Sequence, residues 1–245
     1  MKKYKLANKY NYSLYVDNIN EDNKATHKQS YLHFVSQRKD LVSAKCFATD
    51  WLIKDIDNSE YSLIEYFAGV GISSEIYKQK LNIKEHKVIE LDINCYRQLS
   101  NMKNMKVKLE DGHKAILKYV NYDIKVCDWG TGTIVQYTRG KWTNFLALFI
   151  NQPKYVIWTD TSVAFPAQHS SFKIYAKELN TEFFSTYKDY YKSMSEWLFF
   201  NSGYSISKIA YRGKNACYIL AKKGQHEIEE KIFTLKNYDN GFLEL

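Results

Sequence analysis

The sequence predicts an α/β protein with a seven-stranded, mostly parallel sheet, helices on both faces and a C-terminal antiparallel hairpin. From residue 62 onward, short apolar runs alternate with helical patterns, and strands connected by helices form parallel sheets. Near the end, "YSISKIAYR" and "ACYILAKK" are separated only by "GKN", which is typical of a hairpin. The 245 residues, with 45% hydrophobic content, suffice for one domain with a substantial core.

The alternating region contains five strand–helix units. An amphipathic helix is expected before them, over residues 36–56, because apolar side chains recur there every three or four residues. These apolar positions are Leu41, Ala44, Phe47, Ala48, Leu52 and Ile53. The expected strands are 62–67, 86–93, 105–111, 122–128 and 154–160. The expected helices are 73–81, 95–102, 112–120, 142–151 and 180–203, and the hairpin strands are 204–212 and 216–223.

The chain divides into three expected regions. Residues 1–60 form an N-terminal arm and lead-in helix, residues 61–225 the α/β domain, and residues 226–245 a C-terminal tail. The segment "DNINEDNKATHKQS" is polar and typical of a loop, so the first part of the arm should add little to the core.

The balance of charges favours an acidic partner. Lys and Arg number 35 against 27 Asp and Glu, a formal net charge of +8, which points most often to nucleic acid. The alternative is a solvated basic surface, because several lysines stand in pairs such as Lys2-Lys3 and Lys222-Lys223.

The cysteines and histidines indicate neither a metal site nor a disulfide framework. The four cysteines are far apart and the six histidines are scattered, so we expect no metal and a reducing, cytoplasmic location. No apolar stretch is long enough to cross a membrane, so no membrane partner is expected. Abundant Asn, Lys, Ile and Tyr with only two prolines are typical of AT-rich genomes, such as those of many phages and some bacteria.

An acidic residue lies at the carboxyl end of each of the five predicted strands. In a parallel sheet, ligands bind outside the carboxyl ends of the strands, so polar residues there indicate a binding site. Helix N-terminal caps would explain some of these acids instead. The acids are Glu65, Asp92, Glu110 with Asp111, Asp128, and Asp160.

The two glycines of "EYFAGVG" are typical of a cofactor loop. A dinucleotide-binding loop has a third glycine where this chain has Ser74, and Glu65 just before the loop would repel phosphate. A carboxylate there favours a cationic group such as the amine of an amino acid. Asp92 lies about 20 residues after the glycines, the spacing of an acid that binds ribose hydroxyls. An adenosine that carries an amino acid and no phosphate is S-adenosylmethionine.

The stretch "IEYFAGVG" resembles the first motif of class I, Rossmann-like S-adenosylmethionine-dependent methyltransferases, especially those acting on nucleic acids. "VIELDIN", "KLEDG" and "YDIKVCDWGTGT" resemble the second, third and fourth motifs, and the resemblance covers residues 62 to about 223. It implies S-adenosylmethionine as cofactor, with Asp92 on the ribose, Asp111 on the adenine amino group and Asp128 as the catalytic acid. The implied cofactor-binding residues are Glu65, Phe67, Ala68, Gly69, Gly71, Asp92, Ile93, Glu110, Asp111 and Asp128.

The fourth motif departs from known patterns. Asp128-Trp129-Gly130 lacks the two prolines of DNA amino-methyltransferases, and Cys127 lacks the proline that precedes a cytosine-methylating cysteine, so we interpret it as a core thiol. Ribose 2'-O methyltransferases have a similar fourth motif within a Lys-Asp-Lys-Glu set, but the other members are not obvious in this sequence. A silent binding domain, or a methyltransferase acting on a small molecule or protein, stays open, while DNA is the expected substrate ahead of RNA.

The substrate side of the site is expected at the same edge of the sheet. Asp128 would accept a proton, and Trp129 would act beside it by stacking on a base or would plug the sheet. Asp160, Thr161 and Lys173 are further candidates for contacts with the substrate.

Overall fold

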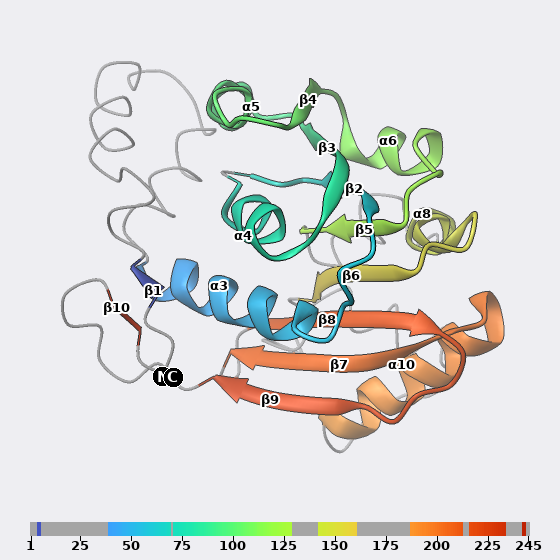
Figure 1. Cartoon of the computed structure of the whole chain (residues 1–245). Coiled ribbons are helices and arrows are strands. Elements are labelled where there is room, and N and C mark those ends of the chain that lie inside the picture. Colours follow the sequence, from blue (N-terminus) through green and yellow to red (C-terminus); the bar gives the residue numbers. More distant parts are fainter. Residues whose placement is uncertain are drawn as a thin grey trace.

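The computed structural model describes residues 4–5, 39–69, 71–128, 142–160, 187–212, 216–233 and 242–243. Its centre is an eight-stranded sheet with the strand order β4-β3-β2-β5-β6-β8-β7-β9 (Figure 1). The strands are β2 (Tyr61–Tyr66), β3 (Ile83–Glu90), β4 (Lys106–Leu109), β5 (Ile124–Cys127), β6 (Tyr155–Asp160), β7 (Tyr204–Arg212), β8 (Ala216–Lys223) and β9 (Glu229–Phe233). A separate pair joins β1 (Tyr4–Lys5) to β10 (Phe242–Leu243).

The predicted fold class is confirmed. Strands β2 to β6 pair in parallel, and β8 is antiparallel to both β6 and β7, as the hairpin predicts. The sheet has one strand more than expected, because β9 lies parallel to β7. This added strand comes from the segment that the sequence suggested was a tail.

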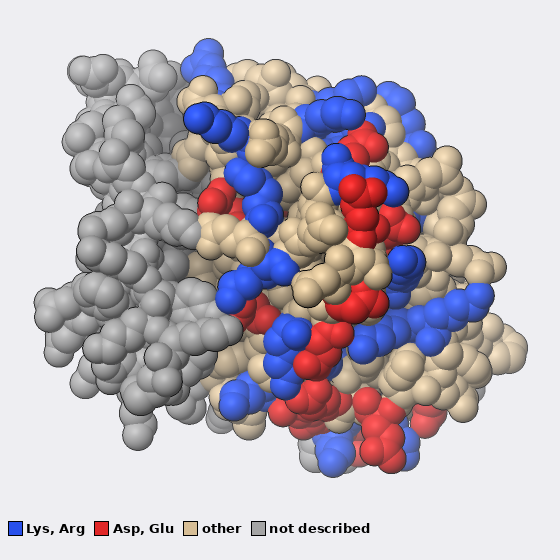
Figure 2. All heavy atoms as spheres, viewed as in Figure 1, with Lys and Arg blue, Asp and Glu red and all other residues tan. Residues whose placement is uncertain are grey.

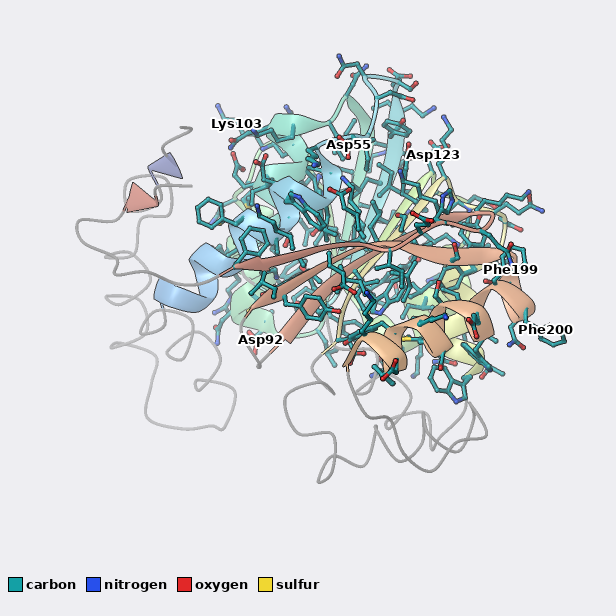
Figure 3. The ribbon with its side chains drawn as sticks, turned by 90° about the horizontal axis from the view of Figure 1, so that it is seen from below. Asp55, Asp92, Lys103, Asp123, Phe199 and Phe200 are labelled. Atoms are coloured by element: carbon teal, nitrogen blue, oxygen red, sulfur yellow. The ribbon has the colours of Figure 1, made fainter. Side chains whose placement is uncertain are left out.

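Helices cover both faces of the sheet. The helices are α3 (Lys39–Ile53), α4 (Ile72–Lys80), α5 (Ile93–Ser100), α6 (Gly112–Lys118), α8 (Thr143–Leu146) with the 3-10 turn η1 (Ala147–Phe149), and α10 (Tyr187–Ser202). Helices α3, α4 and α5 lie on one face, whereas α6, α8 and α10 lie on the other. Figure 3 shows α3 and α10 on opposite sides of β7, β8 and β9.

The face under α6, α8 and α10 is packed with buried aromatic side chains. The rings of Phe145 and Phe149 meet Trp158 of β6 edge-on, at centroid distances of 5.4 and 6.2 Å. The same cluster contains Trp142, Tyr190, Tyr191 and Tyr204, all buried. Such edge-to-face pairs add to the large apolar area that each ring removes from water.

Most predicted elements are confirmed within a few residues, and the largest difference concerns the strand expected at 86–93. That strand runs from Ile83 to Glu90, and Asp92 begins the next helix instead of ending the strand. Of the long helix expected at 180–203, only the part from Tyr187 lies within the described residues.

The order in which strands are added to the sheet changes direction at β2. From this strand the chain passes to β3 and β4 on one side and later to β5 and β6 on the other. The segments that follow β2 and β5 therefore flank the crevice where ligands bind in open α/β sheets.

Candidate functional site

The segment after β2 makes a tight turn into α4. Phe67, Gly69 and Gly71 all have positive φ angles of 59°, 59° and 79°. A Cβ atom on Gly71 would lie 2.7 Å from Cδ2 of Leu99, so both backbone angle and space require glycine there. The sequence prediction of a functional glycine turn thus has a geometric basis.

Glu90, at the end of β3, holds this turn in place. Its Oε2 accepts from the backbone N–H of Gly69 at 2.7 Å, and its Oε1 accepts from the N–H groups of Leu91 and Asp92. Burial raises the pKa of this carboxyl above its usual value, although the three N–H donors oppose the shift. Because the Gly69 N–H already donates to the Glu90 carboxylate, it is not available to bind a phosphate.

Asp92 and Asp111 serve as helix caps. Oδ1 of Asp92 accepts from the N–H groups of Asn94 and Cys95 at the start of α5. Oδ1 of Asp111 accepts from the N–H of His113 at the start of α6. Two of the five acid positions therefore follow the capping interpretation, which the sequence left open.

Apolar side chains beside these acids are exposed. Leu91, directly after β3, is 58% exposed, and Leu109 at the end of β4 is 48% exposed. Ile93, the first residue of α5, is 37% exposed. The neighbouring ends of β3 and β4 thus present an apolar surface next to Glu90, of the kind that a flat heterocycle contacts.

Glu65 lies fully buried in β2, two residues before the turn begins at Phe67. Its Oε2 accepts from the hydroxyl of Ser74 at 3.0 Å, and its Oε1 lies 2.5 Å from Nε2 of His86. Both carboxylate oxygens are therefore engaged inside the protein, whereas the sequence suggested that Glu65 meets a ligand amine.

Asp128 follows β5 on the same face of the sheet and forms an ion pair that the sequence analysis missed. Nζ of Lys45, from α3, donates to Oδ2 of Asp128 at 2.9 Å, with 14% and 6% of the two side chains exposed. Burial raises the pKa of the Asp128 carboxyl; Lys45 opposes this shift and the Glu65 carboxylate adds to it. Ser73 lies beside Asp128 and contacts Thr49, which ties α3 to the start of α4.

A sequence signal for Lys45 existed. It stands three residues before Ala48 and seven before Leu52, on the apolar stripe of the predicted helix. A charged residue on a buried stripe needs a partner, and here that partner is Asp128. We call Lys45, Glu65, Ser73, Ser74, His86 and Asp128 the polar cluster.

Two other predicted residues lie apart from the polar cluster. Asp160 ends β6 but points to the aromatic face, where the hydroxyls of Tyr190 and Tyr191 donate to its Oδ2 at 3.4 and 3.3 Å. Glu110 accepts from Lys118 and from the hydroxyl of Tyr119. The structure brings Glu65 and Asp128 together, but it places Asp160 on the other face.

The ring of Phe67 packs closely against the start of α6. Its ring lies 5.0 Å from that of His113, and a Cβ atom on Gly112 would clash with it at 2.4 Å. The backbone of Ala68 runs through the turn between Phe67 and Gly69, with its side chain buried among Val88 and Leu99.

Several expectations lie outside the described residues or concern absences. Trp129, Thr161 and Lys173 are not among the described residues, so their roles stay predictions. Within the described ranges, no group of three His, Cys, Asp or Glu side chains is placed to hold a metal ion. In the same part of the chain, no helix combines the length and apolar character needed to cross a membrane.

Comparison with known proteins identifies the fold. Trm1 from Pyrococcus horikoshii, in complex with S-adenosyl-L-methionine, is similar with a TM-score of 0.53 at 7% identity, over 77% of this chain and 56% of that one. A putative S-adenosylmethionine dependent methyltransferase from Listeria monocytogenes gives 0.50 at 11% identity, over 73% and 100%. No protein-family model and no curated protein sequence matches this chain. The chain has the Rossmann-like fold of class I S-adenosylmethionine-dependent methyltransferases.

Proposed function

We propose that this chain is an S-adenosylmethionine-dependent methyltransferase that acts on nucleic acid. The observation that carries the proposal is the bond from the Gly69 N–H to Glu90 at the switch point of the sheet. It replaces a phosphate contact with a carboxylate, which favours a nucleoside without phosphates over a dinucleotide. The solved structures with this fold include one in complex with this cofactor.

The residues present fit this cofactor. We assign the ribose hydroxyls to Glu90, which stands at the strand end and whose Oε2 accepts one N–H and keeps a lone pair, whereas Asp92 caps α5. Leu91 offers an apolar surface to the adenine ring. Asp111 follows the neighbouring strand β4, and we assign it to the adenine amino group. The N-terminus of α4 has no side-chain cap, so its N–H groups favour the carboxylate of the amino-acid part.

Asp128 is the proposed proton acceptor. The cofactor supplies an electrophilic methyl group, and the protein must align the nucleophile and take up its proton. A carboxyl whose pKa is raised by burial accepts a proton more readily near neutral pH than an exposed one. Transfer should therefore decline on acidification at a higher pH than an ordinary aspartate would give.

A ribose hydroxyl is a second candidate target. The Lys45–Asp128 ion pair supplies one lysine of the Lys-Asp-Lys-Glu set that the sequence did not reveal. The ammonium stabilises the ionised carboxylate next to the position of the nucleophile. This pair favours a hydroxyl of RNA, whereas the preference for DNA and the phage origin stay predictions from the sequence.

Methyl transfer from labelled cofactor to separate DNA, RNA and protein pools tests the proposal. We expect label in a nucleic acid pool, and loss of transfer by at least about a hundredfold in Asp128→Asn, the scale of a proton-transfer contribution. Asp123→Asn is the matched control, because Asp123 precedes β5 and lies at the opposite edge of the sheet from Asp92 (Figure 3). Label in protein alone, or unchanged transfer in Asp128→Asn, would contradict the proposal.

A further inference from the structure

Three lysines converge on one tyrosine ring on the face that carries α6. Nζ of Lys87 lies 4.4 Å from the ring centroid of Tyr119, and those of Lys118 and Lys108 lie at 4.9 and 5.2 Å. Nζ of Lys87 is also 5.4 Å from the ring of Tyr122. We call these five residues the lysine–tyrosine patch.

The fold places the patch by strand register. Lys87 of β3 pairs with Lys106 and Ile89 pairs with Lys108 of β4, so Lys87 and Lys108 share one face of the sheet. Tyr119 follows α6, and its hydroxyl accepts from Lys108 and donates to Glu110. The rings and the hydroxyl therefore hold the three ammonium groups close together.

The patch has an excess of positive charge. Among the described residues, the ion pairs formed by the three lysines involve one carboxylate, that of Glu110 with Lys118 at 3.0 Å. Lys118, and more weakly Lys108, lower the pKa of this carboxyl, so it stays ionised without balancing all three ammonium groups. Lys108 and Lys118 are both exposed to solvent.

The face with α3 and α4 is different. Figure 2 shows that basic and acidic side chains alternate there. Lys54, Lys80 and Lys84 each pair with a different carboxylate, at 3.3, 2.9 and 4.0 Å, although Glu229 beside Lys54 also meets Lys208. Concentrated charge is thus a property of the patch and does not follow from the chain's net charge alone.

We propose that the lysine–tyrosine patch binds the phosphate backbone of the nucleic acid substrate, an inference that rests on the proposed function. Clustered ammonium groups suit a row of phosphates, and contacts of this kind fix the position of the strand without reading its sequence. Because Glu110 lies next to Asp111 at the end of β4, the patch adjoins the candidate cofactor site.

Fluorescence anisotropy with labelled single-stranded RNA and with duplex DNA, each of mixed sequence, tests the patch. The variant Lys87→Gln/Lys108→Gln/Lys118→Gln should weaken binding at low salt by roughly tenfold or more. Its plot of log affinity against log salt should become shallower by about 2, since each lost phosphate contact removes about 0.7 to 0.9 from the slope. Lys54→Gln/Lys80→Gln/Lys84→Gln changes the net charge equally and should keep the slope of the parent chain.

Equal losses of affinity in both triple variants would overturn the patch and point to net charge. No loss of affinity in either variant would also overturn the patch. Thermal unfolding checks that the variants fold, and Lys108→Gln/Lys118→Gln, which leaves half-buried Lys87 intact, should show about two thirds of the slope change.

Calorimetric titration with S-adenosylmethionine separates the two proposals. If the parent chain binds no cofactor but the patch variant still loses the slope, the proposed function fails and the patch stands. If cofactor and nucleic acid bind normally to the patch variant, the patch fails and the function stands.

Discussion

The two faces of the central strands differ in what they bury. On the face under α6, α8 and α10, the rings of Phe145, Phe149 and Trp158 pack together. On the face under α3 and α4, the polar cluster buries Glu65 against Ser74 and Asp128 against Lys45. Aromatic packing removes much apolar area from water, whereas burying charges costs free energy even when they are paired.

Even the buried ionisable groups differ between the faces. On the aromatic face, Lys125 donates to the backbone carbonyl of Ile150, and Asp160 accepts from the neutral hydroxyls of Tyr190 and Tyr191. On the other face, the carboxylates meet a lysine, a histidine and serines next to the candidate site. The difference indicates that the aromatic face supplies stability, whereas the polar cluster buries charges at a cost beside the site that we propose.

The largest effect on stability is expected on the aromatic face. Phe145→Ala removes a fully buried ring that contacts Trp142, Phe149 and Trp158. We expect the free energy of unfolding to fall by about 3 to 5 kcal/mol, measured by urea denaturation. Cofactor affinity of the folded fraction should stay unchanged, and a large loss of affinity would break the division between the faces.

The ion pair tests whether the polar cluster stabilises the fold. Lys45→Met leaves Asp128 buried without its cation and should lower the free energy of unfolding by about 3 kcal/mol. The double variant Lys45→Met/Asp128→Leu should recover most of that loss, because apolar groups of similar volume replace a buried pair with little cost. A double variant as unstable as the single one would show that the pair itself holds the fold together.

The glycine turn should couple stability to cofactor binding. Gly71→Ala meets both a positive φ angle and a contact of 2.7 Å with Leu99, so we expect a loss of about 1 to 3 kcal/mol. The displaced start of α4 should also weaken cofactor binding, as measured by calorimetry. Gly203→Ala is a suitable control, because it has a similar φ of 76° but open space around it and lies at the end of α10. Equal effects of both substitutions on cofactor binding would contradict a special role for the turn.

The smallest effect is a pH dependence on the aromatic face. Burial lowers the pKa of Lys125 to about 8, below its usual value of about 10.4. Between these two values the unfolded chain binds a proton that the folded chain does not, so this lysine makes stability rise with pH. Urea denaturation at about pH 7.5 and about pH 9.5 should show that rise in the parent chain and a smaller one in Lys125→Met. An identical pH dependence in both proteins would show that Lys125 does not titrate in this range.

The sequence predicted the fold well because alternation of strands and helices is a local pattern. It assigned Asp92 of "VIELDIN" to the end of the strand, whereas the strand ends two residues earlier, at Glu90. The start of α5 decides this, and its boundary is a weak signal in the sequence. The strand β9 was missed because "EEKIF" shows little of the apolar alternation that predicts a strand.

The contacts of the site were harder to predict than its location. Lys45 meets Asp128 only because α3 packs across the sheet, and nothing local connects the two residues. His86 reaches Glu65 through the register of β2 and β3, in which Glu65 is opposite Val88. Motif spacing therefore predicts which strand end a residue occupies, whereas pairing depends on tertiary packing.

Calorimetric titration of S-adenosylmethionine into the parent chain, Glu90→Gln and Asp92→Asn tests the central claim most directly. Asparagine caps a helix about as well as aspartate, so Asp92→Asn keeps α5 intact while it removes the charge. We predict binding to the parent chain, a loss of roughly tenfold or more in Glu90→Gln, and near-parent affinity in Asp92→Asn. No binding to the parent chain would contradict the proposed function, and loss in Asp92→Asn with retained affinity in Glu90→Gln would contradict the assigned ribose contact.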